Sequence, residues 1–181
     1  KIHDLSGTLA FTINATDFNS ASIQAYGFFT EILRADGITL ADNTDNLYKY
    51  SYNTDIISGL GRVNYTLKNR YLFTGTFRAD GTSKFKGSNQ WSYFPSAAFA
   101  WRISEESFLK NQNIASDLKL RLGWGITGNQ SIRPYETYGR YMIDYYADAS
   151  SNPILGIRPE NLGNAGLTWE ETEQFNAGLD L

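Results

Sequence analysis

The sequence lacks several residues on which protein chemistry often depends. Among its 181 residues there is no cysteine, which excludes a disulfide framework, a thiolate metal site and a cysteine nucleophile. His3 is the only histidine and stands near one end, so we expect neither a histidine-based catalytic triad nor a histidine-rich metal site. Charged residues make up only 19% of the chain and the net charge is -3, so we expect no nucleic acid partner.

The sequence also has no run of 18 apolar residues, and it therefore predicts no transmembrane helix. The chain begins at Lys1 without an initiator methionine or a signal-peptide pattern, and it stops at Leu181 in mid-pattern. We therefore expect an excerpt of a longer protein, since 181 residues suffice for one domain or for part of a larger one.

Aromatic residues, by contrast, are abundant at 15%, and between residues 59 and 101 many of them recur at every second position. Alternation kept over consecutive segments predicts antiparallel β-strands, because successive side chains point to opposite faces of a sheet. The expected strands cover residues 5–14, 58–67, 70–79, 91–103, 117–127 and 168–181. The expected connections are a tight turn at 68–69, a polar turn at 80–90, one or two helical turns from Ser104, and two long irregular segments at 15–57 and 128–166. Within the long segments, residues 20–34 are compatible with a short helix and residues 141–146 with a short strand.

Every second connection is short, which is typical of outer-membrane barrels with tight periplasmic turns and long outer loops. Trp91 and Trp101 lie ten residues apart on one face of a single strand. At about 3.3 Å per residue and a tilt of roughly 40°, they are separated by about 25 Å along the membrane normal, the height of the apolar band of such a barrel. The aromatic side chains expected in lipid-facing girdles are Tyr65, Tyr71, Trp91, Trp101, Trp124 and Trp169.

The predicted fold class is therefore all-β, with antiparallel up-and-down strands that form part of a large transmembrane β-barrel, about six strands of it, and long extracellular loops. A soluble extracellular β-sandwich that binds glycans stays open as the alternative, because its strands also alternate apolar with polar residues.

Several stretches carry a resemblance to a known family. They are Arg62-Val-Asn-Tyr65 with Asn69-Arg-Tyr-Leu72, Arg78-Ala-Asp-Gly-Thr-Ser-Lys-Phe85, Tyr93 to Ser104, Leu118 to Gln130, and Leu167 to Asp180. In this order and spacing, the chain resembles the barrel region of SusC/RagA-type TonB-linked outer-membrane proteins of Bacteroidota. Thr82 and Lys84 depart from the family, which more often has Ser and Arg at these positions.

The resemblance implies a multi-pass β-barrel in the outer membrane of a Gram-negative bacterium, of which residues 1–181 are a part that holds no plug domain. It implies import of large nutrients, oligosaccharides or peptides, with outer-membrane lipid around the barrel and a SusD-like lipoprotein as partner. The TonB complex would act through an N-terminal part that this chain does not include. Basic side chains expected to face the lumen or the plug are Arg62, Arg78, Arg102, Lys119 and Arg121. Loop aromatics expected to contact substrate, by stacking on sugar rings, are Tyr48, Tyr50, Tyr52, Tyr135, Tyr138, Tyr141, Tyr145 and Tyr146.

No constellation of catalytic residues emerges, so we expect no enzyme, no catalytic residue and no cofactor. The adjacent carboxylates Glu105–Glu106 and Glu170–Glu171 have the wrong geometry for a glycosidase pair, and we interpret them as helix-start or solvated charges. The segment that starts at Gly59 lacks the third glycine of a dinucleotide-binding motif. Residues 42–46 offer oxygen ligands for a loop Ca²⁺ but lack the EF-hand spacing, so no metal site is expected.

Overall fold

The computed structural model describes residues 2–28, 32, 37–38, 40–109 and 117–181, with the side chains of residues 45–47 outside the description. The chain forms two compact units: Lys1–Asn14 with Asp55–Leu181, and Ala15–Thr54. Two strands run through both units, namely β1 (His3–Phe28) and β2 (Ala41–Leu67). In the described part of the chain, no helix is long and apolar enough to cross a membrane.

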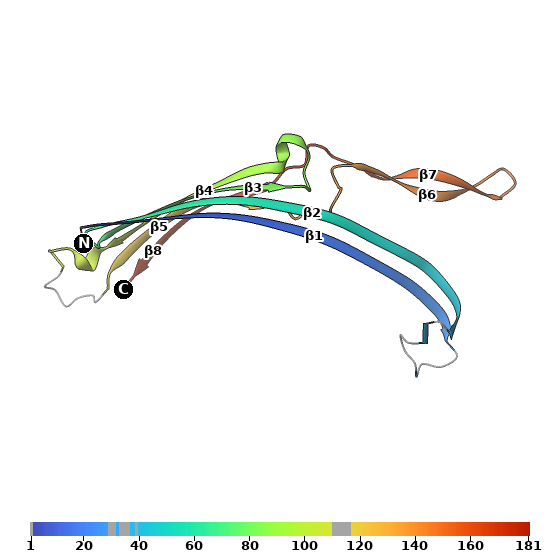
Figure 1. The fold of residues 1–181 in the computed structure, drawn as a ribbon, viewed down its shortest axis with the longest axis horizontal. Helices are drawn as coiled ribbons and strands as arrows, with labels where there is room; N and C mark the ends of the chain where they lie inside the picture. The colour runs from blue at the N-terminus through green and yellow to red at the C-terminus, as the bar shows by residue number, and fades with distance from the viewer. Residues whose placement is uncertain (1, 29–31, 33–36, 39, 110–116) are drawn as a thin grey trace. The chain divides into compact units, whose positions relative to one another are not determined.

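The first unit is a six-stranded sheet with the order β1-β2-β3-β4-β5-β8 (Figure 1). Its remaining members are β3 (Tyr71–Thr82), β4 (Trp91–Arg102), β5 (Lys119–Asn129) and β8 (Glu170–Asp180). From β2 to β8 each strand pairs antiparallel with its neighbour, which confirms the up-and-down order. Between β5 and β8 the chain makes a separate two-stranded hairpin from β6 (Gly139–Ala147) and β7 (Pro153–Leu162).

The turn between β2 and β3 fixes the register of the sheet. Lys68 and Asn69 both have positive φ, 52° and 55°, and Arg70 N–H donates a hydrogen bond of 3.0 Å to the Leu67 carbonyl. Two consecutive residues with positive φ form the turn whose twist matches that of the flanking strands. As a result Tyr65 pairs with Phe73, and Phe73 pairs in turn with Phe99 of β4.

This register sorts the side chains onto two faces. The apolar face carries Val63, Tyr65, Phe73, Phe77, Phe99, Trp101, Leu120, Leu122, Trp124 and Phe175. The polar face carries Arg62, Asn64, Thr74, Thr76, Arg78, Ser96, Ala98, Arg121 and Asn176. Adjacent residues of a strand therefore belong to opposite faces along the whole sheet, as the alternation predicts.

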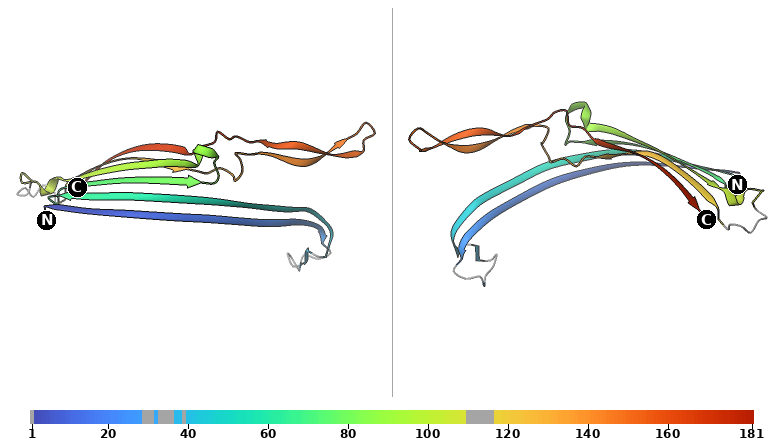
Figure 2. Two further views of the ribbon diagram at one scale, coloured as in Figure 1. Left: turned by 45° about the horizontal axis from the view of Figure 1, so that its top comes forward. Right: turned by 180° about the vertical axis from the view of Figure 1, so that it is seen from behind.

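The sheet of the first unit is a single layer in both views of Figure 2, and no described helix or second sheet covers either face. Large apolar side chains accordingly stay open, with Val63 at 53% and Phe175 at 75% exposure. The buried apolar core of the described residues consists of Phe85, Phe94 and Trp169. A sandwich buries its apolar faces between two sheets, so the β-sandwich alternative is wrong.

The structure differs from expectation in the long connections. Residues 15–28 and 41–54 are not irregular, because β1 and β2 continue through them. The helix expected over 20–34 is wrong as far as Phe28, and residues 29–31 and 33–36 lie outside the described part. Aromatic side chains at alternate positions favour a pleated surface with a partner strand over a helix. The strand expected at 141–146 is confirmed within β6, but residues 153–162 are not irregular as expected, because they form β7. After β4 a single 3₁₀ turn, η3 (Ile103–Glu105), replaces the expected helical turns.

Candidate functional site

The apolar face carries rows of aromatic rings that cross neighbouring strands. Phe73 lies 4.9 Å from Phe99 and 6.3 Å from Tyr65 between ring centroids, and Tyr71 stacks on Trp101 at 6.3 Å. Such cross-strand aromatic pairs stabilise a sheet. Five of the six predicted girdle residues belong to this face, namely Tyr65, Tyr71, Trp91, Trp101 and Trp124.

Two tryptophans of the apolar face lie where its polarity changes. Trp91 pairs with Gly81 at the start of β4, and its indole ring lies over Gly81, in space that is open because glycine has no side chain. Trp124 donates its indole N–H to the Glu173 carboxylate at 2.7 Å, so on this face the ring lies next to a charged residue of β8. An indole with an apolar body and one polar atom suits such a boundary.

The sixth predicted girdle residue, Trp169, lies elsewhere, and its assignment to a lipid-facing girdle is wrong. It is only 7% exposed and packs edge-on against Phe94 at 5.5 Å and against Phe85 at 5.8 Å. Its indole N–H donates to the Gln90 carbonyl at 3.1 Å. Phe94 itself lies against Gly128, where a side chain on the glycine would meet the phenyl ring at 2.1 Å. Trp169 therefore ties the entry to β8 to the loop between β3 and β4.

The five basic residues predicted for the lumen lie on the polar face or at its end. Arg78 pairs with the buried Asp80 at 2.8 Å and donates to Ser58 at 3.3 Å. Arg62 donates to the Thr76 hydroxyl at 3.1 Å, in a hollow of this face that Thr74, Gln174 and Asn176 also line. Arg121 pairs with Asp180 at 2.6 Å, Arg102 lies 3.8 Å from Glu105, and Lys119 pairs in register with Arg102. Three of the five therefore have carboxylate partners within this chain.

Three of the predicted contact tyrosines lie together in the second unit. Tyr48, Tyr50 and Tyr52 occupy alternate positions of β2, and their centroids are 6.4 Å and 5.6 Å apart. Phe18 of β1 stacks on Tyr52 at 4.9 Å, an aromatic contact that the sequence did not reveal. Residues 15–28 have no regular period of two, so the sequence does not predict the strand that places Phe18 next to Tyr52.

The other five tyrosines belong to the β6–β7 hairpin and its approach. Tyr135 has a positive φ of 65°, and Lys86 places its ammonium group 4.7 Å from the centre of the Tyr138 ring. Tyr141 and Tyr145 share one side of the hairpin with Ile143, opposite Pro159, Leu155 and Ile157. Tyr146 lies on the other side, over Gly156. The structure therefore separates the predicted tyrosines into two groups.

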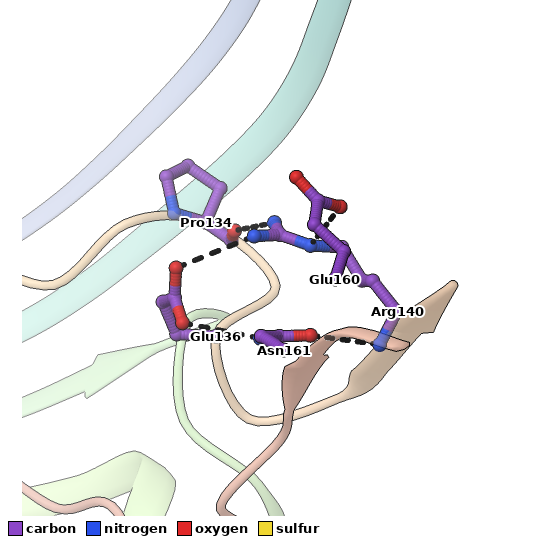
Figure 3. Close-up of polar contacts among 5 residues, drawn as sticks. All are labelled: Pro134, Glu136, Arg140, Glu160 and Asn161. Carbon is purple, nitrogen blue, oxygen red and sulfur yellow. Dashed lines mark hydrogen bonds and ion pairs between the residues drawn. The ribbon is translucent and has the colours of Figure 1, made fainter. Parts of the chain in front are cut away.

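Arg140 organises the base of the hairpin (Figure 3). Its guanidinium lies 3.4 Å from the Glu136 carboxylate, 3.2 Å from that of Glu160 and 3.5 Å from the Pro134 carbonyl. Asn161 links the two sides, since it accepts a bond of 2.7 Å from the Arg140 backbone and donates one of 3.2 Å to Glu136. These contacts join the approach to β6 with the end of β7.

The base of the hairpin also depends on Gly163, which has a positive φ of 48°. A side chain there would meet the Gly139 backbone nitrogen at 2.2 Å. Only glycine suits both the backbone conformation and the close approach.

The described residues provide no set of side chains that could bind a metal ion. They contain no group of three or more His, Cys, Asp or Glu side chains that could hold a metal ion. The segment considered for a loop Ca²⁺, residues 42–46, lies partly outside the described side chains. The Glu170 carboxylate accepts a hydrogen bond of 3.0 Å from the Asn129 side chain, and the Glu171 carboxylate accepts one of 2.5 Å from the Ser92 hydroxyl.

Similar proteins give these surfaces a context. No family model matches the sequence. The chain is 46% identical over 135 residues to the TonB-dependent receptor SusC of Bacteroides thetaiotaomicron, covering 73% of the chain and 14% of SusC. It is 32% identical over 187 residues to the TonB-dependent receptor P39 of Formosa agariphila, covering 99% of the chain and 17% of the relative. Among solved structures it is similar to the RagAB peptide transporter, with a TM-score of 0.77 at 24% identity, covering 99% of the chain and 20% of that structure's chain.

The chain belongs to the SusC/RagA-type TonB-dependent receptors. Its open sheet of antiparallel strands is part of their β-barrel. The relatives are receptors and not enzymes, in agreement with the expectation from the sequence. The chain spans only 14–20% of the length of these relatives.

Where the receptor sheet ends in short turns, Glu106 forms a polar cluster that the sequence did not predict. It is 8% exposed and not a solvated charge as expected. Arg70 donates to it at 2.8 Å, the Tyr71 hydroxyl at 2.7 Å and the Trp101 indole at 3.1 Å. The Tyr71 bond, followed by the Trp101 bond, holds the pKa of the Glu106 carboxyl below its usual range. One carboxylate therefore joins the β2–β3 turn to the segment that follows β4.

This cluster predicts a pH-dependent turn. Because the pKa of Glu106 is lowered in the folded state, its stabilisation is complete above the ordinary glutamate value of about 4.3 and is lost as the pH falls through the folded value. Glu106→Gln in the full-length receptor should lower the protection factors of the amides of residues 67–71 several-fold at pH 7 and flatten the pH dependence of these protection factors. Hydrogen exchange measured from pH 3 to pH 7 checks this.

The neighbouring residue is the control. Glu105 is more exposed and its pair with Arg102 is long, at 3.8 Å, so Glu105→Gln should change the exchange rates little. Equal effects of the two substitutions would contradict a specific role for Glu106.

Proposed function

We propose that the receptor to which this chain belongs imports large nutrients, oligosaccharides or peptides, across the outer membrane of a Gram-negative bacterium. One observation carries the proposal: the sheet is a single layer with one apolar and one polar face, in a chain of the TonB-dependent receptor family. A soluble protein rarely leaves so large an apolar surface open. The chain contributes several spans of a multi-pass barrel.

The apolar face then contacts lipid, and the polar face lines the lumen. The exposed side chains of Val63, Phe73 and Phe175 are suited to contact with hydrocarbon. Hydrocarbon cannot form hydrogen bonds with the backbone, but the backbone N–H and C=O groups are already paired between neighbouring strands. Among the described residues, Arg62 and Lys119 form no ion pair with a carboxylate, and both are suited to carboxylates of a plug. Energy would reach the plug from the TonB complex, through a part of the receptor outside this chain.

The β6–β7 hairpin is suited to a protein partner at the outer side, in our proposal a SusD-like lipoprotein. One side of the hairpin exposes Tyr141, Ile143 and Tyr145 opposite Leu155 and Ile157, and Tyr145 is 69% exposed. The other side is held by an ion pair between Asp144 and Arg158. Aromatic and aliphatic side chains without charges are the usual core of a protein interface.

Uptake measurements test the function. Cells with the full-length receptor should accumulate a fluorescently labelled nutrient, whereas cells without the receptor, or without TonB, should lose at least about nine-tenths of that uptake. Accumulation that persists without TonB would contradict the proposal.

In the same cells Ile157→Glu should reduce co-purification of the lipoprotein, while Arg158→Lys on the opposite side of the hairpin should not.

A further inference from the structure

The β6–β7 hairpin is joined to the six-stranded sheet by two connecting segments that lie outside any strand. The first leg, residues 130–138, leads from β5 into β6, and the second leg, residues 163–169, leads from β7 to β8. In the described part of the chain, the hairpin forms a sheet of its own and pairs with no strand of the larger sheet. The two legs therefore determine where the hairpin presents its apolar side.

The loop between β3 and β4, residues 83–90, holds the first leg. The Lys86 ammonium group lies 4.7 Å from the centre of the Tyr138 ring, at the end of this leg. Phe85 is only 2% exposed and belongs to the buried core, against which Ile132 of the same leg packs. A cation on an aromatic ring and an apolar contact thus attach the first leg to the loop.

The same loop also holds the second leg. The Asn89 side-chain amide donates a hydrogen bond of 3.3 Å to the Leu167 carbonyl, and the Leu167 side chain packs against the buried core. The Trp169 indole N–H donates to the Gln90 carbonyl at 3.1 Å. One short loop therefore contacts both legs of the hairpin.

A 3₁₀ turn, η2 (Gly87–Gln90), fixes the spacing of the two polar contacts in this loop. The Lys86 carbonyl, just before the turn, accepts a hydrogen bond of 3.3 Å from the Asn89 N–H. Gly87 has a positive φ of 61°, which favours glycine. Lys86 and Asn89 are thus held relative to each other while each contacts a different leg.

The two legs also contact each other at the base of the hairpin. The Asn164 N–H donates to the Glu136 carbonyl at 3.2 Å. Next to this bond, the ion pair between Arg140 and Glu160, at 3.2 Å, closes the base (Figure 3). A shift of one leg therefore moves the other leg and the hairpin with it.

We propose that Lys86 and Asn89 are positioning residues for the docking of the lipoprotein. Each holds one leg, and together they keep the hairpin in the orientation in which its apolar side meets the partner. The inference rests on the proposed function, because its partner is the one proposed for the hairpin. Affinity for that partner falls with the fraction of receptors whose hairpin is correctly oriented.

Titration of the purified full-length receptor tests the first leg. The probe is the SusD-like lipoprotein that co-purifies with the native receptor, separated from it and titrated back. Lys86→Met keeps the length of the side chain without its charge and should weaken binding about threefold to fivefold. Lys86→Arg keeps a cation over the ring and should stay within about twofold. Lys86→Met combined with Tyr138→Leu should bind as Tyr138→Leu alone, because both substitutions remove the same contact.

Asn89→Ala tests the second leg and should weaken binding about threefold, as expected for the loss of one hydrogen bond. Ser88→Ala is the matched control, since Ser88 is the exposed neighbour in the same turn and should tolerate the substitution. Hydrogen exchange separates misplacement from unfolding. Protection should fall in residues 130–138 of Lys86→Met but stay unchanged within β6 and β7.

The inference is overturned if Lys86→Met or Asn89→Ala binds the lipoprotein as the native receptor does, or if Ser88→Ala causes an equal loss. Additive losses from Lys86→Met and Tyr138→Leu would indicate a direct contact of Lys86 with the lipoprotein and would also overturn it, as would loss of protection within β6 and β7. TonB-dependent uptake, together with weaker lipoprotein binding in Ile157→Glu, would then leave the proposed function intact.

Discussion

Ala97→Arg in the full-length receptor should lower the free energy of unfolding by about 2–4 kcal/mol, whereas Ala98→Arg should cost less than about 1 kcal/mol. The two alanines are adjacent and exposed in the middle of β4. Ala97 pairs with Gly75 and Trp124 on the apolar face, and Ala98 pairs with Thr74 and Gly123 on the polar face. The two variants thus place the same guanidinium on opposite faces of one sheet.

The difference between the variants measures which solvent each face meets. Near the middle of a bilayer an arginine on the lipid side loses its hydration, while on the lumen side it stays in water. Reversible unfolding in lipid vesicles, followed by tryptophan fluorescence, gives both values. Equal costs would mean that the faces meet the same medium, and a larger cost for Ala98→Arg would reverse their assignment.

The alternation in the sequence was sufficient to predict the strands of the six-stranded sheet within the first unit and the face on which their residues lie, but not β7. Tyr65, Phe73 and Phe99 align across three strands because every strand keeps a period of two and the turn at Lys68–Asn69 is tight. In such a sheet, a shift of one residue would exchange the two faces. The tight turn and the period of two together therefore determine the register of these strands.

The second unit was not predicted because apolar and polar residues do not alternate regularly there. Apolar residues occupy odd positions from Leu5 to Ile13, but between Ala15 and Phe28 they occupy odd positions, as at Ile23, as well as even ones, as at Phe18. No period of two therefore marks a strand after Asn14, although β1 continues to Phe28.

Sequence could not predict side chains whose surroundings come from distant segments. Glu106 depends on Arg70, which precedes it by 36 residues, and its burial follows from the way two turns meet. The strand predicted from Thr168 includes Trp169, whereas β8 begins only at Glu170. Outside a strand the period of two does not hold, so the indole was free to pack on Phe94 and Phe85.

Trp169→Ala is expected to cost about 3–5 kcal/mol in the full-length receptor, the usual cost of truncating a buried aromatic residue. The substitution removes a ring that contacts both other members of the buried core, Phe85 and Phe94, and it removes the bond to the Gln90 carbonyl. We expect the loop over residues 83–90 to loosen, because Trp169 connects it to the start of β8. Unfolding in lipid vesicles gives the total cost, and limited proteolysis locates the loosened loop.

Two controls separate burial from aromatic character. Trp169→Phe keeps most of the packing and should recover more than half of the stability that the alanine variant loses. Phe175→Ala truncates a ring that is 75% exposed in the sheet and contacts lipid in our proposal, so it should cost no more than about 1–2 kcal/mol. If Trp169→Ala were as mild as Phe175→Ala, the packing of the indole on Phe85 and Phe94 would contribute little to the stability of the receptor, which would contradict the prediction.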